Sequence, residues 1–96
     1  MMVVVAYDVN TETPAGRRRL RRVALACGAF GQRVQYSVFE CLVSEADLVR
    51  LHVRLKKEMD PQHDSIRIYT IDEASRRKIQ HFGVRKPRDL EQPLVI

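Results

Sequence analysis

One acidic residue and a dense group of arginines are the side chains of this sequence most able to do chemistry. Asp8 ends the apolar run "VVVAYD". A lone carboxylate at a strand end is commonly an ordinary loop acid. Two such carboxylates repel each other unless a proton or a cation lies between them. Mg²⁺ accepts one or two carboxylates together with water and phosphate oxygens, so Asp8 is a candidate metal ligand if a second copy approaches it.

Arginines crowd the segment that follows, at Arg17, Arg18, Arg19, Arg21 and Arg22. They fall in the first turns of a predicted helix, where cations oppose the helix dipole. Glu12 is the only acid nearby, so a mixed salt-bridge surface is not expected. A solvated helix face remains one interpretation. Arginine binds phosphate bidentately, which favours a phosphate-binding track that includes Arg17, Arg18 and Arg21.

Composition is consistent with a polyanionic partner. The 96-residue chain carries 17 Lys and Arg against 12 Asp and Glu, which favours nucleic acid or an anionic membrane face. No apolar run approaches the roughly 18 residues of a membrane span, and no signal peptide is recognisable. We therefore expect a cytoplasmic protein. Cys27 and Cys41 fit neither a zinc site nor a disulfide framework and are expected to be buried reduced thiols.

The elements that must position these residues follow a β-α-β-β-α-β order. Thr13 and Pro14 begin the first helix as N-cap and first helical residue, and Ser44 caps the second. Strands are expected over residues 2–9, 32–43 with a turn at Tyr36-Ser37, and 65–72. This is the α+β, ferredoxin-like arrangement, with two helices on one face of an antiparallel sheet. A further short strand is expected over residues 76–82. The predicted domain spans residues 1–83, followed by a tail over 84–96.

The first strand is apolar on both of its faces, which has a consequence for assembly. Val3 and Val5 alternate with Val4 and Ala6, whereas a sheet with one wet face should alternate apolar and polar residues. Something must therefore cover the second face, and a second copy of the chain is the economical cover. Asp8 shares the parity of Val4 and Ala6. A face-to-face homodimer would bring two Asp8 side chains together across its axis.

Three segments together resemble the small CRISPR-associated Cas-two family: "YDVNTETPAGRRRLRRV", "RVQYSVFECLVS" and "DSIRIYTID". The resemblance covers nearly the whole chain and is strongest to the branch found with type I-C systems. It implies a ferredoxin-like homodimer in which an extra C-terminal strand, about residues 78–82, is exchanged onto the partner's sheet. It also implies that Asp8 is the catalytic, metal-binding acid, one from each protomer, with Mg²⁺ as cofactor.

The resemblance implies two kinds of activity. Family members are described as metal-dependent endonucleases on RNA or double-stranded DNA. They are also described as non-catalytic scaffolds in spacer acquisition, where the dimer bridges the CRISPR integrase and holds duplex DNA on its basic surface. "VRKP" is similar to a stretch that contacts this duplex, so Arg85 and Lys86 are candidate DNA-binding residues. Ser37 and Phe39 fall at the family's "SVFE" positions, near the cleft.

Plainer interpretations stay open for several of these residues. Phe39 and Tyr7 can be core residues, Ser37 a turn residue, and Glu40 a surface ion-pair partner. One acid per chain without a general base is a thin active site for hydrolysis, which favours the scaffold role. An unrelated ferredoxin-like RNA-binding module is the third hypothesis. The apolar end, residues 94–96, is expected to contact the integrase or the partner's sheet.

Overall fold

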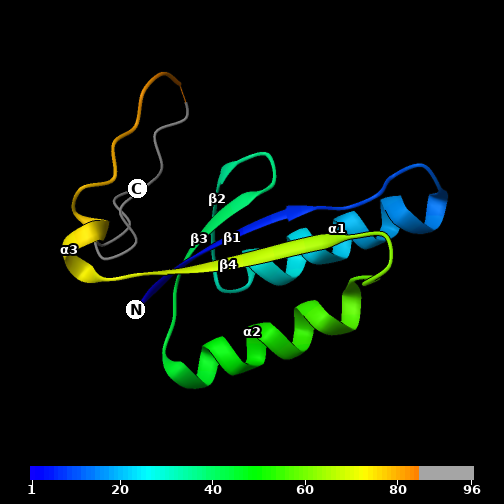
Figure 1. Cartoon of the computed structure of the whole chain (residues 1–96), viewed down its shortest axis with the longest axis horizontal. Coiled ribbons are helices and arrows are strands. Elements are labelled where there is room, and N and C mark those ends of the chain that lie inside the picture. The colour runs from blue at the N-terminus through cyan, green and yellow to red at the C-terminus, as the bar shows by residue number, and fades with distance from the viewer. Residues whose placement is uncertain (85–96) are drawn as a thin grey trace, which may run out of the picture.

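A four-stranded antiparallel sheet carries two long helices on one of its faces (Figure 1). The computed structural model describes residues 1–84. The sheet order is β2-β3-β1-β4, with strands Gly31–Gln35, Val38–Leu42, Met2–Asp8 and Ser65–Ile71 in that order. The helices are α1 (Pro14–Gly28), α2 (Glu45–Glu58) and the single-turn α3 (Glu73–Arg76). The predicted α+β, ferredoxin-like fold is confirmed.

Both long helices begin where their caps were predicted. The Thr13 hydroxyl accepts a hydrogen bond from the Gly16 amide at 3.0 Å, and Pro14 occupies the first turn. The Ser44 hydroxyl accepts one from the Asp47 amide at 3.1 Å. Each bond satisfies an amide that lacks a partner within the first turn of its helix. These local signals fix the ends of the helices that pack on the sheet.

Gly16 is required by a close approach at the start of α1. A β-carbon at this position would overlap the backbone carbonyl oxygen of Asn10. The loop that follows β1 therefore lies directly against the first turn of α1, with no room for a side chain between them. This contact places the end of β1 and the arginines of α1 at the same edge of the fold.

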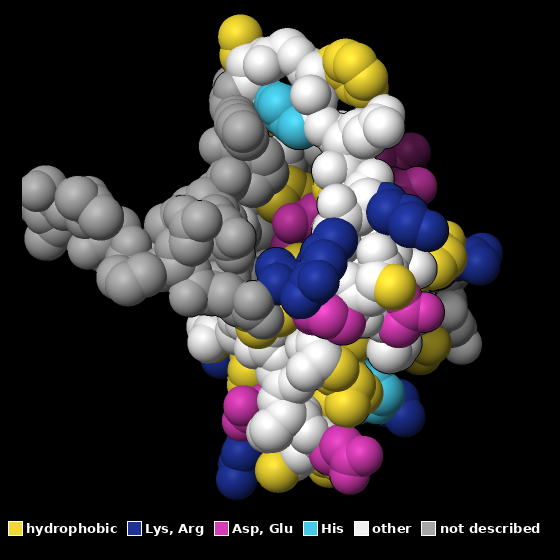
Figure 2. Space-filling view, turned by 90° about the vertical axis from the view of Figure 1, so that its left-hand side faces the viewer, with side chains coloured by type: hydrophobic (Ala, Val, Ile, Leu, Met, Phe, Trp, Pro, Cys, Tyr) yellow, Lys and Arg dark blue, Asp and Glu magenta, His cyan; other side chains and the backbone are white. Residues whose placement is uncertain are grey.

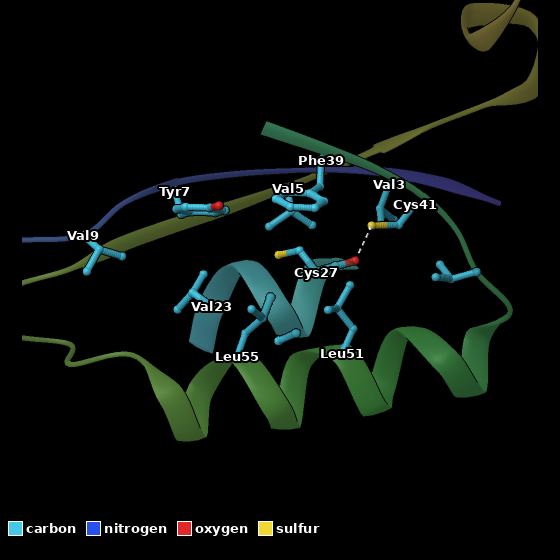
Figure 3. Close-up of a cluster of buried hydrophobic side chains, with 12 residues drawn as sticks. Val3, Val5, Tyr7, Val9, Val23, Cys27, Phe39, Cys41, Leu51 and Leu55 are labelled. Carbon is cyan, nitrogen blue, oxygen red and sulfur yellow. Dashed lines mark hydrogen bonds between the residues drawn. The ribbon is translucent and has the colours of Figure 1, made fainter. Parts of the chain in front are cut away.

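The hydrophobic core lies between the sheet and the two long helices (Figure 3). Val3, Val5 and Tyr7 project from β1 toward this core, where Leu51 of α2 is also fully buried. Cys27 and Cys41 are free and buried, as expected. Burial raises the pKa of the Cys27 thiol to about 12 and that of Cys41 to about 11. Both thiols are therefore protonated and act as small apolar side chains.

No helix of residues 1–84 covers the opposite face of the sheet, and Asp8 lies on that face. Val4 and Ala6 alternate with the core residues of β1 and are half-buried, whereas Asp8 is exposed. In β4, Tyr69 pairs with Val4, and Arg67 pairs with Ala6. We call this surface the helix-free face. Its apolar residues on β1 agree with the reasoning that predicted a face-to-face homodimer, which stays a prediction.

The strand expected over residues 76–82 is not formed within the single chain. The Asp72 carboxylate accepts a hydrogen bond from the Ser75 amide at 2.7 Å and caps α3, which ends at Arg76. Residues 77–84 form no strand. A strand requires backbone hydrogen bonds to a neighbouring strand, and residues 77–84 do not pair with the sheet, although its edge strands β2 and β4 each have one unpaired side within the described residues. Exchange of residues 78–82 onto a partner's sheet stays a prediction.

The C-terminal residues 85–96 lie outside the described part of the chain. This part of the chain includes the DNA-binding candidates Arg85 and Lys86 and the apolar end at 94–96. It also includes all of the tail predicted over residues 84–96 except Val84. The domain boundary at residue 83 therefore stays a prediction. Among residues 1–84, no helix is long and apolar enough to cross a membrane.

Candidate metal and nucleic-acid site

Asp8 is the last residue of β1 and stands exposed at the edge of the helix-free face. In the register of the sheet it pairs with Ser65, the first residue of β4. Residues 1–84 contain no group of three His, Cys, Asp or Glu side chains that could together hold a metal ion. A single chain thus supplies one hard carboxylate at this position. A divalent cation held here would need its remaining ligands from a second copy, water or phosphate.

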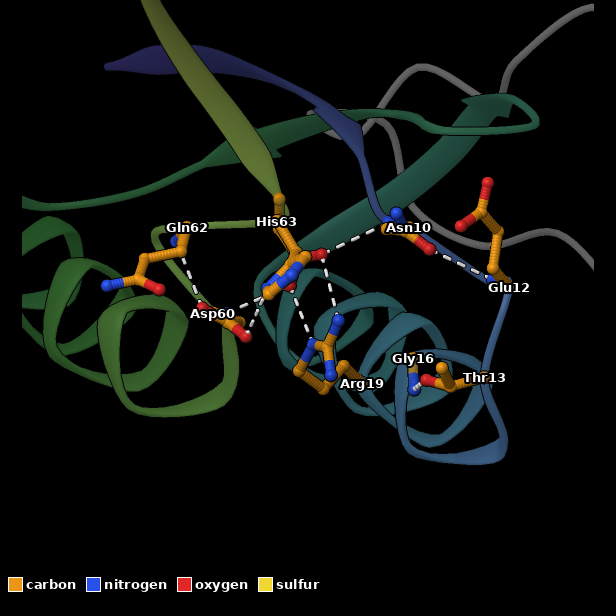
Figure 4. Close-up of polar contacts among 9 residues, drawn as sticks. Asn10, Glu12, Thr13, Gly16, Arg19, Asp60, Gln62 and His63 are labelled. Atoms are coloured by element: carbon orange, nitrogen blue, oxygen red, sulfur yellow. Dashed lines mark hydrogen bonds and ion pairs between the residues drawn. The ribbon is translucent and has the colours of Figure 1, made fainter.

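A buried carboxylate, Asp64, holds the loop that follows Asp8. One oxygen, Oδ1, accepts hydrogen bonds from the Asn10 amide at 3.1 Å and from Arg19 Nη2 at 3.2 Å. The other, Oδ2, accepts from Arg19 Nε at 2.8 Å and from the Asp60 amide at 2.9 Å. Figure 4 shows Arg19 of α1 and the Asn10 loop converging beside the loop that carries Asp60. We call this set of contacts the Asp64 junction.

The Asp64 junction ties three segments together at the end of β1. It joins the β1–α1 loop, the first half of α1 and the loop that precedes β4. The Arg19 guanidinium holds the pKa of Asp64 below its ordinary value, and the two backbone amides add to this effect. The carboxylate side chain has no exposed surface, although it lies outside the hydrophobic core. The junction is therefore a fixed anchor two residues beyond Asp8.

Sequence reasoning missed the junction and the acidic partner of Arg19. All five arginines were expected to lack acidic partners apart from Glu12, but Arg19 pairs with Asp64, 45 residues away in the chain. No local spacing indicates this pair, because the two residues meet only when β1 and β4 lie side by side. The one available signal was an acid placed directly before a predicted strand. Arg19 is a structural residue and does not belong to the phosphate-binding track.

The remaining arginines of α1 project from the fold. Arg17, Arg18, Arg21 and Arg22 are exposed, and no carboxylate within residues 1–84 pairs with them. Arg17 Nη1 donates to the Thr11 carbonyl oxygen at 3.2 Å, which leaves its other donors available. Unpaired guanidinium groups on one helix form a surface that attracts phosphate. This geometry is what the predicted track requires.

The basic residues near α3 are in a different situation. Glu73 pairs with Arg76 at 3.1 Å and with Arg77 at 3.4 Å. Figure 2, which looks onto this end of the molecule, shows basic and acidic side chains side by side. Their charges are partly compensated, so α1 carries the stronger uncompensated positive charge of the two.

The structure separates two residues that the "SVFE" segment places near a cleft. Phe39 is 4 % exposed and faces the helices, where its ring stacks on Tyr7 with centroids 6.2 Å apart. It lies on the side of the sheet opposite Asp8. Ser37 is closer to Asp8, because its carbonyl oxygen accepts a hydrogen bond from the Tyr7 amide at 3.1 Å. Of these two residues, Ser37 is therefore the one that lies beside the end of β1.

Glu40 lies on the same face of the sheet as Asp8. It pairs with Val4 in the register of β1 and β3 and is half-buried. Burial raises the pKa of its carboxyl group. No ion pair involves Glu40 within the described residues, in contrast to the surface ion-pair role considered for it.

Comparison with known proteins identifies the family of this chain. A family model described as "CRISPR associated protein Cas2" matches residues 1–79. A Chlorobaculum tepidum protein named CRISPR-associated endoribonuclease Cas2 is 54 % identical over the full length of both chains. A Halalkalibacterium halodurans protein named CRISPR-associated endonuclease Cas2 is 44 % identical over 99 % of each. The crystal structure of Streptococcus pyogenes Cas2 at pH 6.5 superposes with a TM-score of 0.78 at 53 % identity, covering 86 % of this chain and 100 % of that one. The assignment to the type I-C branch stays a prediction, but the chain belongs to the CRISPR-associated Cas2 family.

Proposed function

We propose that this protein acts as a homodimer in CRISPR spacer acquisition and cleaves phosphodiester bonds with Mg²⁺ held by two Asp8 carboxylates. One observation carries the proposal: Asp8 is exposed on the helix-free face, in line with Val4 and Ala6. Packing of two such faces brings the two carboxylates toward a common axis. Relatives named endoribonuclease and endonuclease support hydrolysis of nucleic acid as the reaction.

The residues present fit a hard divalent cation only when two chains combine. Each chain offers one carboxylate, and carboxylate, water and phosphate oxygens are the ligands that Mg²⁺ prefers. When bound, the cation supplies activated water and stabilises charge on the phosphate. The chain's own contributions are distinct. Asp8 would hold the cation, and the Asp64 junction fixes the loop behind it.

The exposed arginines of α1 would bind the nucleic acid itself. Arg17, Arg18 and Arg21 carry uncompensated charge at the same edge of the fold as Asp8. Phosphate contacts of this kind position a duplex without reading its sequence. We expect binding to double-stranded DNA and to RNA, with Arg85 and Lys86 as further candidates.

A second candidate function is a scaffold without hydrolysis. The observation that favours it is that residues 1–84 contain no group of three possible metal ligands, so each chain offers fewer ligands than an efficient nuclease usually has. In this role the dimer bridges the CRISPR integrase and holds the duplex on its basic surface. Asp8 would then be dispensable. The two functions are compatible with one protein.

Replacement of Asp8 separates the two functions. Asp8→Asn should abolish Mg²⁺-dependent cleavage of RNA and duplex DNA, because it removes the negative charge with which the two Asp8 carboxylates would hold the cation. The same variant should bind duplex and retain the CRISPR integrase in a pull-down as well as the unmodified protein does. Glu12→Gln, which removes an exposed acid from the neighbouring loop, is the matched control and should leave all three measurements unchanged.

The outcomes distinguish the proposals. Cleavage by Asp8→Asn at the unmodified rate would show that Asp8 is not catalytic. No cleavage by the unmodified protein, combined with retention of the integrase, would leave the scaffold as the function. Failure to bind either duplex or integrase would contradict both.

A further inference from the structure

A pocket of about 750 Å³ lies between α1 and the β2–β3 hairpin, on the side of the sheet opposite Asp8. Tyr7 and Phe39 contribute aromatic surface to it, and Leu20 and Ala24 of α1 contribute aliphatic surface. Its volume is in the range of small-molecule sites. Neither the metal site nor the helix-free face includes it.

The Tyr7 hydroxyl is the unusual feature of this pocket. Tyr7 is only 6 % exposed, and its hydroxyl is buried without a hydrogen-bond partner. Burial raises the pKa of Tyr7, and the nearby Arg33 guanidinium offsets part of that rise. The group is therefore a protonated donor at neutral pH. Leaving such a group unpaired costs free energy, so an acceptor from a ligand would be stabilising here.

Arg33 and Tyr36 provide flat surfaces at the mouth of the pocket. The Arg33 guanidinium carbon lies 5.2 Å from the centre of the Phe39 ring and 6.0 Å from that of Tyr36. Tyr36 itself is 74 % exposed at the hairpin turn. Aromatic rings and guanidinium planes are the surfaces on which unpaired bases stack. Arg33 is exposed and has no acidic partner in residues 1–84, so its guanidinium plane is available to a ligand.

The positive charge of the pocket favours an anionic ligand. Arg17, Arg21 and Arg33 line it, and no Asp or Glu does so among the described residues. A positive rim around an apolar and aromatic interior suits an anion with a planar body. A nucleotide has this chemistry, with the phosphate outside and the base inside.

We infer that this pocket binds one unpaired base of a single strand, with the base stacked at Tyr36 and Arg33 and accepting a hydrogen bond from Tyr7. The flanking phosphates lie on Arg17 and Arg21. The inference rests on the nucleic-acid binding proposed above and adds a site that a closed duplex cannot fill, because its bases are paired and stacked. The pocket makes the protein responsive to single-stranded or frayed nucleic acid.

Binding of three labelled probes to the full chain tests the inference. The probes are a thymidine strand, an abasic strand of equal length and a duplex of equal length, measured by fluorescence anisotropy with EDTA present to prevent cleavage. The unmodified protein should bind the thymidine strand about tenfold more tightly than the abasic strand. Tyr36→Ala should remove most of this preference, and Tyr7→Phe should reduce it about threefold. Neither should change duplex affinity.

Two comparisons keep the outcomes separate. Tyr7→Phe removes only the unpaired hydroxyl, so its thermal unfolding midpoint should stay the same or rise, and lost binding is then not lost folding. Val53→Ala, on the exposed face of α2, should leave all three affinities unchanged. Equal binding of thymidine and abasic strands, with salt-dependent duplex binding intact, would overturn this inference alone. Loss of duplex binding by the unmodified protein would instead contradict the proposed function.

Discussion

At the scale of single residues, the most informative pair is Arg19 and Asp64. A guanidinium and a carboxylate that are both near the surface usually contribute little. Here the Asp64 side chain is fully covered and accepts two backbone amides in addition to Arg19. Removing the carboxylate would leave these donors without an acceptor. The pair therefore holds the loop behind Asp8 more firmly than an exposed ion pair could.

Asp64→Asn should lower the free energy of unfolding at pH 7 by about 2 kcal/mol, because charged hydrogen bonds to a covered group are lost. The pKa of Asp64 is lowered in the folded state, so its contribution is present above the ordinary aspartate pKa of about 3.9 and is lost as pH falls through the folded value. Urea unfolding from pH 7 to about pH 2 should show the two proteins converging below about pH 4.

The control for this measurement is Asp47→Asn, which removes an exposed partner of Arg50 on α2. Its unfolding midpoint should change little at any pH. A constant difference between the Asp64 variant and the unmodified protein across the pH range would contradict the role assigned to the carboxylate charge.

At the scale of elements, α1 combines a buried side and a cationic side. Val23 and Cys27 pack into the core, while Arg17, Arg18 and Arg21 are exposed. The contact of Arg19 with Asp64 ties α1 to the loop that precedes β4, which helps to hold the remaining arginines in place. A rigid helix that presents several unpaired guanidinium groups loses little entropy when phosphates bind.

Triple replacement of Arg17, Arg18 and Arg21 by Ala should weaken duplex binding equally for all sequences. It should also flatten the slope of log affinity against log salt by about 3, since each phosphate contact releases counterions. The matched control replaces Arg50, Arg54 and Lys57 of α2, which removes the same charge from another surface and should leave the slope nearly unchanged. An unchanged slope in the α1 variant would move the phosphate contacts elsewhere, including Arg85 and Lys86.

At the scale of the whole molecule, the helix-free face has apolar residues that another surface could bury. Val4 and Ala6 lie on it, and Tyr69 of β4 is 47 % exposed there. A domain of this length has a small core, so additional burial between two copies would stabilise it considerably. The same burial would form the paired Asp8 site. Assembly and chemistry are therefore linked in the proposed function.

Sedimentation at micromolar concentration should give twice the chain mass. Ala6→Glu, which places a charge in the middle of the helix-free face, should give a folded monomer and lose Mg²⁺-dependent cleavage. Val53→Glu puts the same charge on the exposed side of α2 and should remain a dimer. An unmodified protein that is monomeric with a folded circular dichroism spectrum would remove the basis of the shared metal site.

The local signals in the chain were sufficient to predict most elements. Thr13 with Pro14, Ser44, and the turn at Tyr36-Ser37 act within a few residues of their own backbone, so their effects could be read before any fold was known. The alternation of β1 likewise assigned Asp8 to the face of Val4 and Ala6. Secondary-structure propensity, helix capping and side-chain parity depend only on neighbouring residues, so they can be predicted directly from the sequence.

Only the folded chain decided which distant residues meet. Arg19 finds Asp64 across 45 residues, and Phe39 turns toward Tyr7 and the helices because the register of β1 and β3 puts it there. The Tyr7 hydroxyl is left unpaired by the packing of α1 against the hairpin. Residues 76–82 carry the composition of a strand, yet they form none, because a strand also needs backbone pairing that local composition does not supply. These contacts are long-range, and their geometry exists only after the sheet has assembled.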